Sequence, residues 1–136
     1  MTTPQYEALL DSITDDDCRK AFDFMLDRGA IGADNRLTIE AISFQLYKAV
    51  GDNAIRKTRD VLEILRTEYR VPICSTSGKP GRWLAASEDE KRECLADFYA
   101  RRDSLSKVIN ALERAPVPAA KELSKPAQAE QLGFAL

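Results

Sequence analysis

The chain has 136 residues, of which 44% are hydrophobic and 31% charged, which suits one folded domain and excludes a disordered chain. Its formal net charge is −2 and its isoelectric point is near 5.3. These values exclude a uniformly basic protein that binds nucleic acid through its whole surface. No apolar run approaches the ~18 residues of a membrane span, and the first residues do not resemble a signal peptide. We therefore expect a cytoplasmic protein without membrane contact.

The three cysteines, Cys18, Cys74 and Cys94, lie far apart and lack CxxC spacing. The chain has no histidine to complete a metal site or to act as a base. We expect reduced thiols, no metal and no cofactor.

Two helices are predicted in the first part of the chain. Residues 15–29 begin with the carboxylates Asp15 to Asp17, which suit a helix N-terminus, and finish at Gly29, which suits a helix end. Residues 36–51 follow with Thr38 as the N-cap and Gly51 as the end. The apolar positions are Ala21, Phe22, Met25 and Leu26 in the first segment, and Ile39, Ile42, Phe44, Leu46 and Tyr47 in the second.

Residues 52–70 predict a third helix, capped by Asp52 or Asn53. Its inward positions have spacings of 3, 4 and 7, and its opposite and flanking positions carry cations. The inward set is Ile55, Thr58, Leu62, Leu65 and Tyr69, and the cations are Arg56, Lys57, Arg59 and Arg66.

Pro72 forbids further helix, and the segments VPICS and RWLAAS predict a two-stranded hairpin around the loop TSGKPG. Ser87 and Glu90 then form a capping-box signature for a last helix over residues 88–115. About 27 residues at 1.5 Å each make roughly 40 Å, longer than a small domain needs, so we expect part of this helix to pack on a second copy. Its heptad-like apolar positions are Leu95, Phe98, Leu105, Ile109 and Leu112, interrupted by Arg102.

Three helices followed by a hairpin are the order of a winged helix-turn-helix, so residues 1–87 predict that domain and a mainly α fold with a β-hairpin wing. In that fold the third helix enters the DNA major groove and the hairpin lies against the backbone. The predicted loop offers phosphate donors, and Gly78 and Gly81 allow close approach. The loop donors are Ser75, Thr76, Ser77, Lys79 and Arg82.

The charge distribution favours a local DNA-binding face. Residues 48–82 carry eight cations and four carboxylates, net +4, whereas residues 1–35 carry three cations and eight carboxylates, net −5. The alternative is that these cations form a solvated helix face. The predicted base readers are Asn53, Arg56, Lys57 and Asp60, and the whole predicted DNA-binding set adds Arg59, Ser77, Lys79 and Arg82.

Trp83 has two interpretations. Its ring could stack on an unpaired base, as in single-strand binders. The favoured interpretation is that Trp83, at an alternate strand position beside Leu84, packs the hairpin against the last helix.

The segment IRKTRDVLEILRTEYRVPICSTSGKPGRWLA, followed by a charged helix, resembles small winged-helix proteins of tailed bacteriophages and prophages. In that family a helix ending in an aromatic residue runs into a Pro-Ile-Cys/Ala-Ser strand, a short turn and a Gly-Tyr-Trp/Tyr-Leu-Ala strand. The resemblance covers about residues 39–115 and implies a regulator or a replication accessory protein. Arg82 replaces a common aromatic residue and the loop 76–80 is longer than usual, so no wing-tip contact is carried over. The matching positions are Tyr69, Pro72, Ile73, Cys74, Ser75, Gly81, Trp83, Leu84 and Ala85.

Residues 116–136 predict a flexible tail, because three prolines and several alanines precede the apolar end QLGFAL. That end resembles the short peptide by which bacterial replication and repair proteins bind the sliding clamp, which implies a hydrogen bond from Gln131 and apolar contacts from Leu132, Phe134 and Leu136. The alternative is a tail that packs on its own domain.

The chain shows no catalytic constellation, because it has no histidine, no P-loop and no base near Ser75 to Ser77 in sequence. The sequence therefore predicts a non-enzymatic, sequence-specific binder of double-stranded DNA from a phage or prophage, acting in transcription regulation or DNA replication in the bacterial cytoplasm as a candidate homodimer. The rival prediction is a protein-interaction module that binds a host protein, such as the sliding clamp, through its tail or its winged-helix surface.

Overall fold

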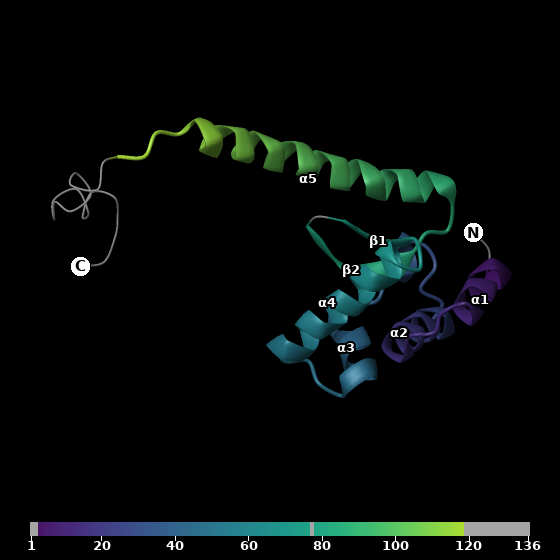
Figure 1. The fold of residues 1–136 in the computed structure, drawn as a ribbon. Coiled ribbons are helices and arrows are strands. Elements are labelled where there is room, and N and C mark those ends of the chain that lie inside the picture. The colour runs from purple at the N-terminus through teal and green to yellow at the C-terminus, as the bar shows by residue number, and fades with distance from the viewer. Residues whose placement is uncertain (1–2, 77, 119–136) are drawn as a thin grey trace. The chain divides into compact units, whose positions relative to one another are not determined.

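The structure, a computed structural model, describes residues 3–76 and 78–118, and helices make up most of that part (Figure 1). Contacts divide the chain into two units, residues 1–100 and 101–136, and the boundary falls inside the last helix. The helices are α1 (Thr3–Asp11), α2 (Asp16–Asp27), α3 (Ile39–Tyr47), α4 (Asp52–Thr67) and α5 (Glu88–Arg114), the short 3-10 helix is η1 (Ala33–Asn35), and the strands are β1 (Ile73–Thr76) and β2 (Lys79–Leu84).

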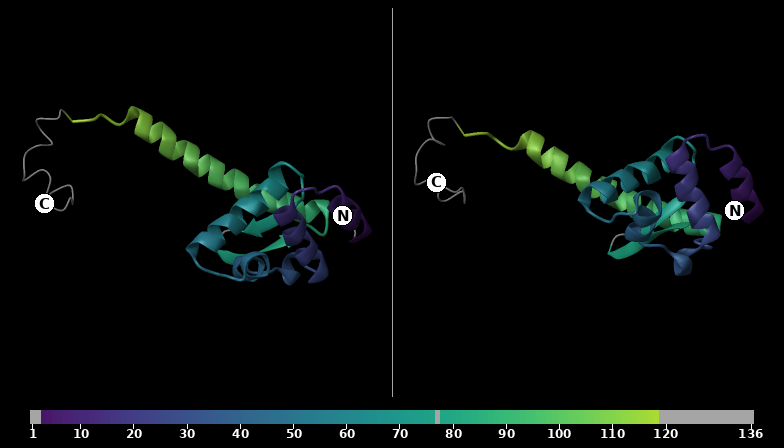
Figure 2. Two further views of the ribbon diagram at one scale, coloured as in Figure 1. Left: turned by 60° about the horizontal axis from the view of Figure 1, so that its bottom comes forward. Right: turned by 90° about the horizontal axis from the view of Figure 1, so that it is seen from below.

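The core of the first unit lies between α2, α3 and α4, which contact one another pairwise. Helices α3 and α4 lie side by side in every view (Figure 2). The inward side chains include Phe22, Met25, Ile42 and Leu65, each with no exposed surface. Among the described residues, no helix is long and apolar enough to cross a membrane.

Helix α1 was not predicted. Tyr6 is the one fully buried residue among the described residues of this helix, and the short apolar series Tyr6, Leu9, Leu10 and Ile13, at spacings of 3, 4 and 7, was the signal that could have found it. Tyr6 stacks edge-on against Phe22 with ring centroids 6.0 Å apart, and its hydroxyl donates to the carbonyl of Ala85 at 2.6 Å. Contacts with residues distant in sequence therefore hold α1 in place, and the sequence does not identify those partners.

The helix caps confirm two predictions and correct two. Asp15 caps α2 by accepting from the Cys18 N–H, and Thr38 caps α3 by accepting from the Ala41 N–H. Helix α3 was expected to run to Gly51, but it ends at Tyr47 because Lys48 adopts a left-handed conformation with φ of 54°. The predicted caps Asp52 and Asn53 lie inside α4, because Gly51 is still extended and takes the N-cap position.

The Asp15 cap gives a pH-dependent contribution to stability. The Cys18 backbone N–H donates to the carboxylate at 2.9 Å and holds the pKa of Asp15 below its usual value. Because the folded state favours the ionised form, this contribution is complete above the unfolded pKa of about 3.9 and is lost as pH falls through the lower folded pKa. Asp15→Ala should lower the unfolding free energy by about 1 kcal/mol at neutral pH in urea denaturation.

Asp15→Asn is the matched control for this cap, because the amide oxygen still accepts the hydrogen bond but does not titrate. The stability difference between the wild-type protein and the Asp15→Asn variant should change with pH only at the acidic end of a denaturation series. A difference that changes instead near neutral pH would contradict the assignment to the Asp15 carboxylate.

The predicted hairpin is present as the antiparallel pair β1–β2, with Ile73 opposite Leu84 and Cys74 opposite Trp83. The register shifts between Cys74 and Thr76. Residues before α3 extend this sheet through isolated bridges, because Ile31 pairs with Leu84 and Leu37 pairs with Arg82. The fold is therefore mainly helical with a small antiparallel sheet, and the sheet is joined to the segment between α2 and α3.

Gly81 occupies a position that only glycine fits. Its φ is 121°, and a Cβ there would lie 2.7 Å from Cδ of Arg36. Its lack of a side chain therefore admits Arg36, whereas the sequence suggested that it admits a phosphate. We expect Gly81→Ala to destabilise the protein by about 1–3 kcal/mol in thermal denaturation.

Gly78→Ala is the matched control for Gly81→Ala, because Gly78 also has a positive φ, 82°, but a Cβ there meets nothing within 4 Å. The control should be the milder change. Arg36→Ala removes the clashing Cγ and Cδ but also the contact with the Trp83 ring, so the double variant should lose less stability than the sum of the two single variants. Equal losses at the two glycines would show that backbone conformation alone causes the effect.

The start of α5 packs against the hairpin. The Ser87 hydroxyl accepts from the Glu90 N–H at 3.2 Å, which confirms the predicted cap. Trp83 is 3% exposed and packs in a cluster with Cys74, Ala85 and Cys94, with Phe98 at its edge. Trp83 is therefore a core residue of the hairpin, as the favoured interpretation predicted.

In the second unit, the α5 residues 101–114 are exposed. The apolar ones among them include Leu105, Val108, Ile109 and Leu112. The predicted tail residues Gln131, Leu132, Phe134 and Leu136 lie outside the described part of the chain.

Candidate nucleic-acid interface

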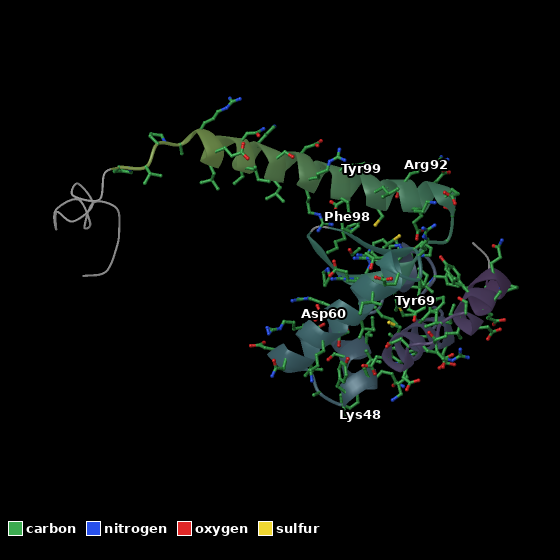
Figure 3. All side chains as sticks on the ribbon, in the orientation of Figure 1. Lys48, Asp60, Tyr69, Arg92, Phe98 and Tyr99 are labelled. Atoms are coloured by element: carbon green, nitrogen blue, oxygen red, sulfur yellow. The ribbon has the colours of Figure 1, made fainter. Side chains whose placement is uncertain are left out.

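The outer face of α4 carries four of the predicted DNA-binding residues in one stripe. Asn53, Arg56, Lys57 and Asp60 follow spacings of 3, 4 and 7, which place them on one side of a helix. All four are exposed, and the opposite side of α4 buries apolar residues in the core. Asp60 is labelled on α4 in Figure 3. The amphipathic pattern of α4 therefore presents the stripe to solvent.

A short, fixed turn links α3 to α4. The Lys48 N–H donates to the Phe44 carbonyl at 2.8 Å, and the Ser43 hydroxyl donates to the Ala49 carbonyl at 2.7 Å. Ser43 has no exposed surface, so its hydroxyl fixes the turn from within the core. The N-cap Gly51 has no side chain that could cap the first backbone N–H groups of α4.

Two depressions share Arg59 of α4, and one is lined by stripe residues whereas the other is lined by a hairpin residue. One, of about 620 Å³, is lined by Val50, Asn53, Arg56 and Arg59 among others. The second, of about 370 Å³, is lined by Arg59 and by Arg82 of β2. Arg59 lines both, so Arg56, Arg59 and Arg82 lie on neighbouring surface, together with the carboxylates of Glu40, Asp52 and Glu63.

The other hairpin predictions have different outcomes. Lys79 is exposed at the start of β2, but it lines neither depression. Ser77 lies outside the described residues. Ser75, proposed as a phosphate donor, is only 8% exposed and its Oγ lies 3.2 Å from Nη2 of Arg66. The Ser75 prediction is therefore wrong, because this side chain points toward the interior.

Arg66 differs from the other α4 cations. Its Nε donates to the Ile73 carbonyl at 2.8 Å, and its guanidinium lies 5.4 Å from the centroid of the Phe98 ring. It thus ties α4 to β1 and to the start of α5. Arg66 supports the arrangement of helix and hairpin and does not belong to the exposed stripe.

Sequence reasoning missed two apolar residues beside the turn. Phe44 is 54% exposed and Val50 is 53% exposed, whereas the sequence places Phe44 only among the apolar positions of the second predicted helix. The inward residues Ile39, Ile42 and Leu46 have spacings of 3 and 4, and position 44 falls outside that series. This spacing could have identified Phe44 as an outward residue.

The described residues offer little for metal or thiol chemistry. Within residues 3–76 and 78–118, no three His, Cys, Asp or Glu side chains gather at a place that could hold a metal ion. All three cysteines are free and buried, and burial raises the pKa of Cys18 and of Cys74 to about 12. The Cys18 and Cys74 thiols are therefore protonated at neutral pH, which disfavours nucleophilic attack.

Comparison with known proteins finds no family model, no curated protein and no solved structure that matches the chain.

Proposed function

We propose that the protein is a winged helix-turn-helix that binds double-stranded DNA with α4 as the recognition helix and the β1–β2 hairpin as the wing. The observation that carries the proposal is the exposed stripe of Asn53, Arg56, Lys57 and Asp60 on the helix that follows the fixed turn. Recognition helices read bases with their N-terminal turns, and this stripe begins in the first turn of α4.

The stripe carries the residue types that read base edges in the major groove. Arginine pairs bidentately with guanine, asparagine with adenine, and a carboxylate accepts from cytosine N4. Arg56, Asn53 and Asp60 supply these three chemistries within about two helical turns. Arg59 of α4 and Arg82 of β2 line one depression together with Glu63, so cations of the helix and of the hairpin lie close enough to contact the same duplex.

The remaining cations suit phosphate contacts, which position a protein on DNA without reading its sequence. The Lys57 ammonium lies 5.8 Å from the ring centroid of Tyr47, the last residue of α3, and is therefore beside the turn between α3 and α4. Lys79 is exposed on the hairpin. Contacts from both elements would place DNA across α4 and the wing.

The proposal includes the biological role that the phage resemblance implies, regulation of transcription or organisation of replication.

The proposal also includes a homodimer, because the 101–114 part of α5 exposes Leu105, Ile109 and Leu112 at heptad-like spacing. Sedimentation velocity of the full chain should show a dimer that Ile109→Asp converts to a monomer. A wild-type monomer at the highest attainable concentration would exclude the dimer.

The function is tested by fluorescence anisotropy of labelled random-sequence duplex DNA at rising salt. Four phosphate contacts should give a slope of log affinity against log salt of roughly −3.6, a loss of roughly a hundredfold from about 50 to 200 mM salt. Absence of binding at the lowest salt concentration would overturn the proposal. A steep slope justifies selecting the specific site from a random duplex pool.

A further inference from the structure

A depression of about 270 Å³ lies at the C-terminal end of α4, between the segment leading into β1 and the first turns of α5. We call it the α4–α5 groove. Its apolar lining includes Val71, Pro72 and Ile73 from the segment, and Leu95 and Phe98 from α5. All of these residues belong to the first unit, and Figure 3 labels Phe98 on α5.

The groove has a packed apolar floor and an open apolar edge. Val71 and Ile73 are 2% and 4% exposed, whereas Leu95 is 38% exposed. An incoming apolar side chain can therefore bury itself and Leu95 against a floor that already exists. Ligand pockets for drug-sized molecules are typically about 300–1,000 Å³, so this smaller space suits one or two anchoring side chains of a peptide.

The charged lining of the groove is cationic. Arg66, Arg70 and Lys91 line it, and no carboxylate among the described residues does. Arg66 is fixed by its hydrogen bond to the Ile73 carbonyl, and Lys91 also contacts Glu88 at 2.7 Å on the same helix. Arg70 and Lys91 additionally line the adjacent smaller depression, where Glu88, the ion-pair partner of Lys91, lies beside them.

The backbone of Arg70 supports a role for its side chain. Arg70 has a φ of 56°, a left-handed conformation that usually falls to glycine or asparagine just after a helix. The Val71 N–H donates to the Leu65 carbonyl at 3.0 Å and closes this turn at the end of α4. Glycine would adopt this backbone conformation without strain, yet the position carries an arginine. The guanidinium at the groove edge therefore points to a role for its charge.

We propose that the α4–α5 groove binds a peptide segment of another protein that carries an apolar anchor flanked by carboxylates. The anchor contacts Leu95, Phe98 and the 71–73 floor, and the carboxylates pair with Arg70 and Lys91. A nucleic-acid backbone matches the charges but has no apolar group for the floor. Peptide recognition by an apolar groove with charged edges is a common mode of binding.

The groove and the proposed DNA-binding stripe lie at opposite ends of α4. Asn53 and Arg56 are in the first turns, whereas Arg66 and Arg70 are at and beyond the last turn. The 16 residues of α4 span roughly 24 Å, so the groove lies well away from Asn53 and Arg56, whereas Arg66 and Phe98 line both the groove and the Arg59–Arg82 depression. The inference therefore does not depend on the DNA-binding proposal.

The test is selection of peptides from a random dodecapeptide library displayed on phage, with the full chain as bait. Enriched peptides are synthesised with a fluorescent label, and their affinity is measured by anisotropy for wild type, Leu95→Asp and Arg70→Gly. We expect enrichment of Asp or Glu beside large apolar residues, and binding at least tenfold weaker for both variants. Arg70→Gly should retain or raise the melting temperature, because it relieves the left-handed arginine.

Two matched controls separate the groove from general effects. Lys48→Gly also replaces a cation with positive φ, 54°, and Val117→Asp also replaces an exposed apolar residue by a carboxylate. Both controls should bind the selected peptides with wild-type affinity. The inference is overturned if no peptide is enriched, if enriched peptides lack acidic residues, or if Leu95→Asp and Arg70→Gly bind them normally. Loss of duplex DNA binding by Arg70→Gly, with peptide binding unchanged, would assign the groove edge to DNA instead.

Discussion

Replacing Arg56 and Lys57 together by alanine is expected to weaken binding to duplex DNA at least tenfold without lowering the melting temperature. Both side chains are exposed on the outer face of α4, so their removal leaves the packed face of the helix intact. A base contact by arginine contributes about 1–3 kcal/mol, and about 1.4 kcal/mol corresponds to a tenfold change in affinity. Anisotropy titrations and thermal denaturation of the same preparations measure the two quantities.

The matched control for this pair removes the same charge from the acidic part of the protein. Lys20 and Arg28 belong to residues 1–35, whose net charge is −5, and both are exposed at α2. Lys20→Ala with Arg28→Ala should leave DNA affinity within a fewfold of wild type. If both double variants weaken binding equally, net charge determines the affinity and α4 has no special role. A loss of folding in the Arg56 and Lys57 variant would make these residues structural.

Trp83→Ala is expected to lower the free energy of unfolding by about 3–5 kcal/mol, as for other large-to-small changes of buried aromatic residues. Trp83 is 3% exposed and is enclosed by Cys74, Ala85 and Cys94. Its ring also lies 4.5 Å from the guanidinium carbon of Arg36, so the substitution removes a cation–π contact as well. Urea denaturation followed by far-UV circular dichroism measures the loss.

Trp83→Phe is the control for packing, because the smaller ring keeps most of the apolar contact, and it should be much less destabilising than alanine. The alternative role of Trp83, stacking on an unpaired base, makes the opposite prediction. In that case Trp83→Ala would preserve stability and would weaken binding to single-stranded DNA by about 1–3 kcal/mol. The two measurements therefore distinguish a core residue from a nucleic-acid contact.

The hairpin and α4 were predictable because their signals are local. Pro72 ends helical structure, and the flanking residues favour strands. In α4, Thr58, Leu62 and Leu65 repeat at helical spacing and all three are buried. The exposed positions of Asn53, Arg56, Lys57 and Asp60 follow from the same spacing. A surface stripe of the proposed interface was therefore accessible from the pattern of one helix.

Two of the failed predictions concern residues whose environment comes from other parts of the chain. The hydroxyl of Ser75 was expected to face phosphate, but its Oγ accepts a hydrogen bond from Nη2 of Arg66 in α4. Gly81 was expected to make room for a ligand, but Arg36 fills that space. Neither partner is a sequence neighbour, so no local pattern records the contact.

By itself, the sequence determined the helical identity of most of the chain, the hairpin, the caps Asp15, Thr38 and Ser87, and the exposed stripe of α4. These features depend on periodicity and on hydrogen bonds within a few residues, which any segment carries with it. Only the tertiary structure decided that α1 joins the core through Tyr6 and Ala85, that Arg59 and Arg82 border one depression, and that α4 and α5 enclose a cationic apolar groove. Each of these features arises from packing between segments that are far apart in the chain. Burial there depends on which two faces come into contact, and the residues of one face alone do not determine it.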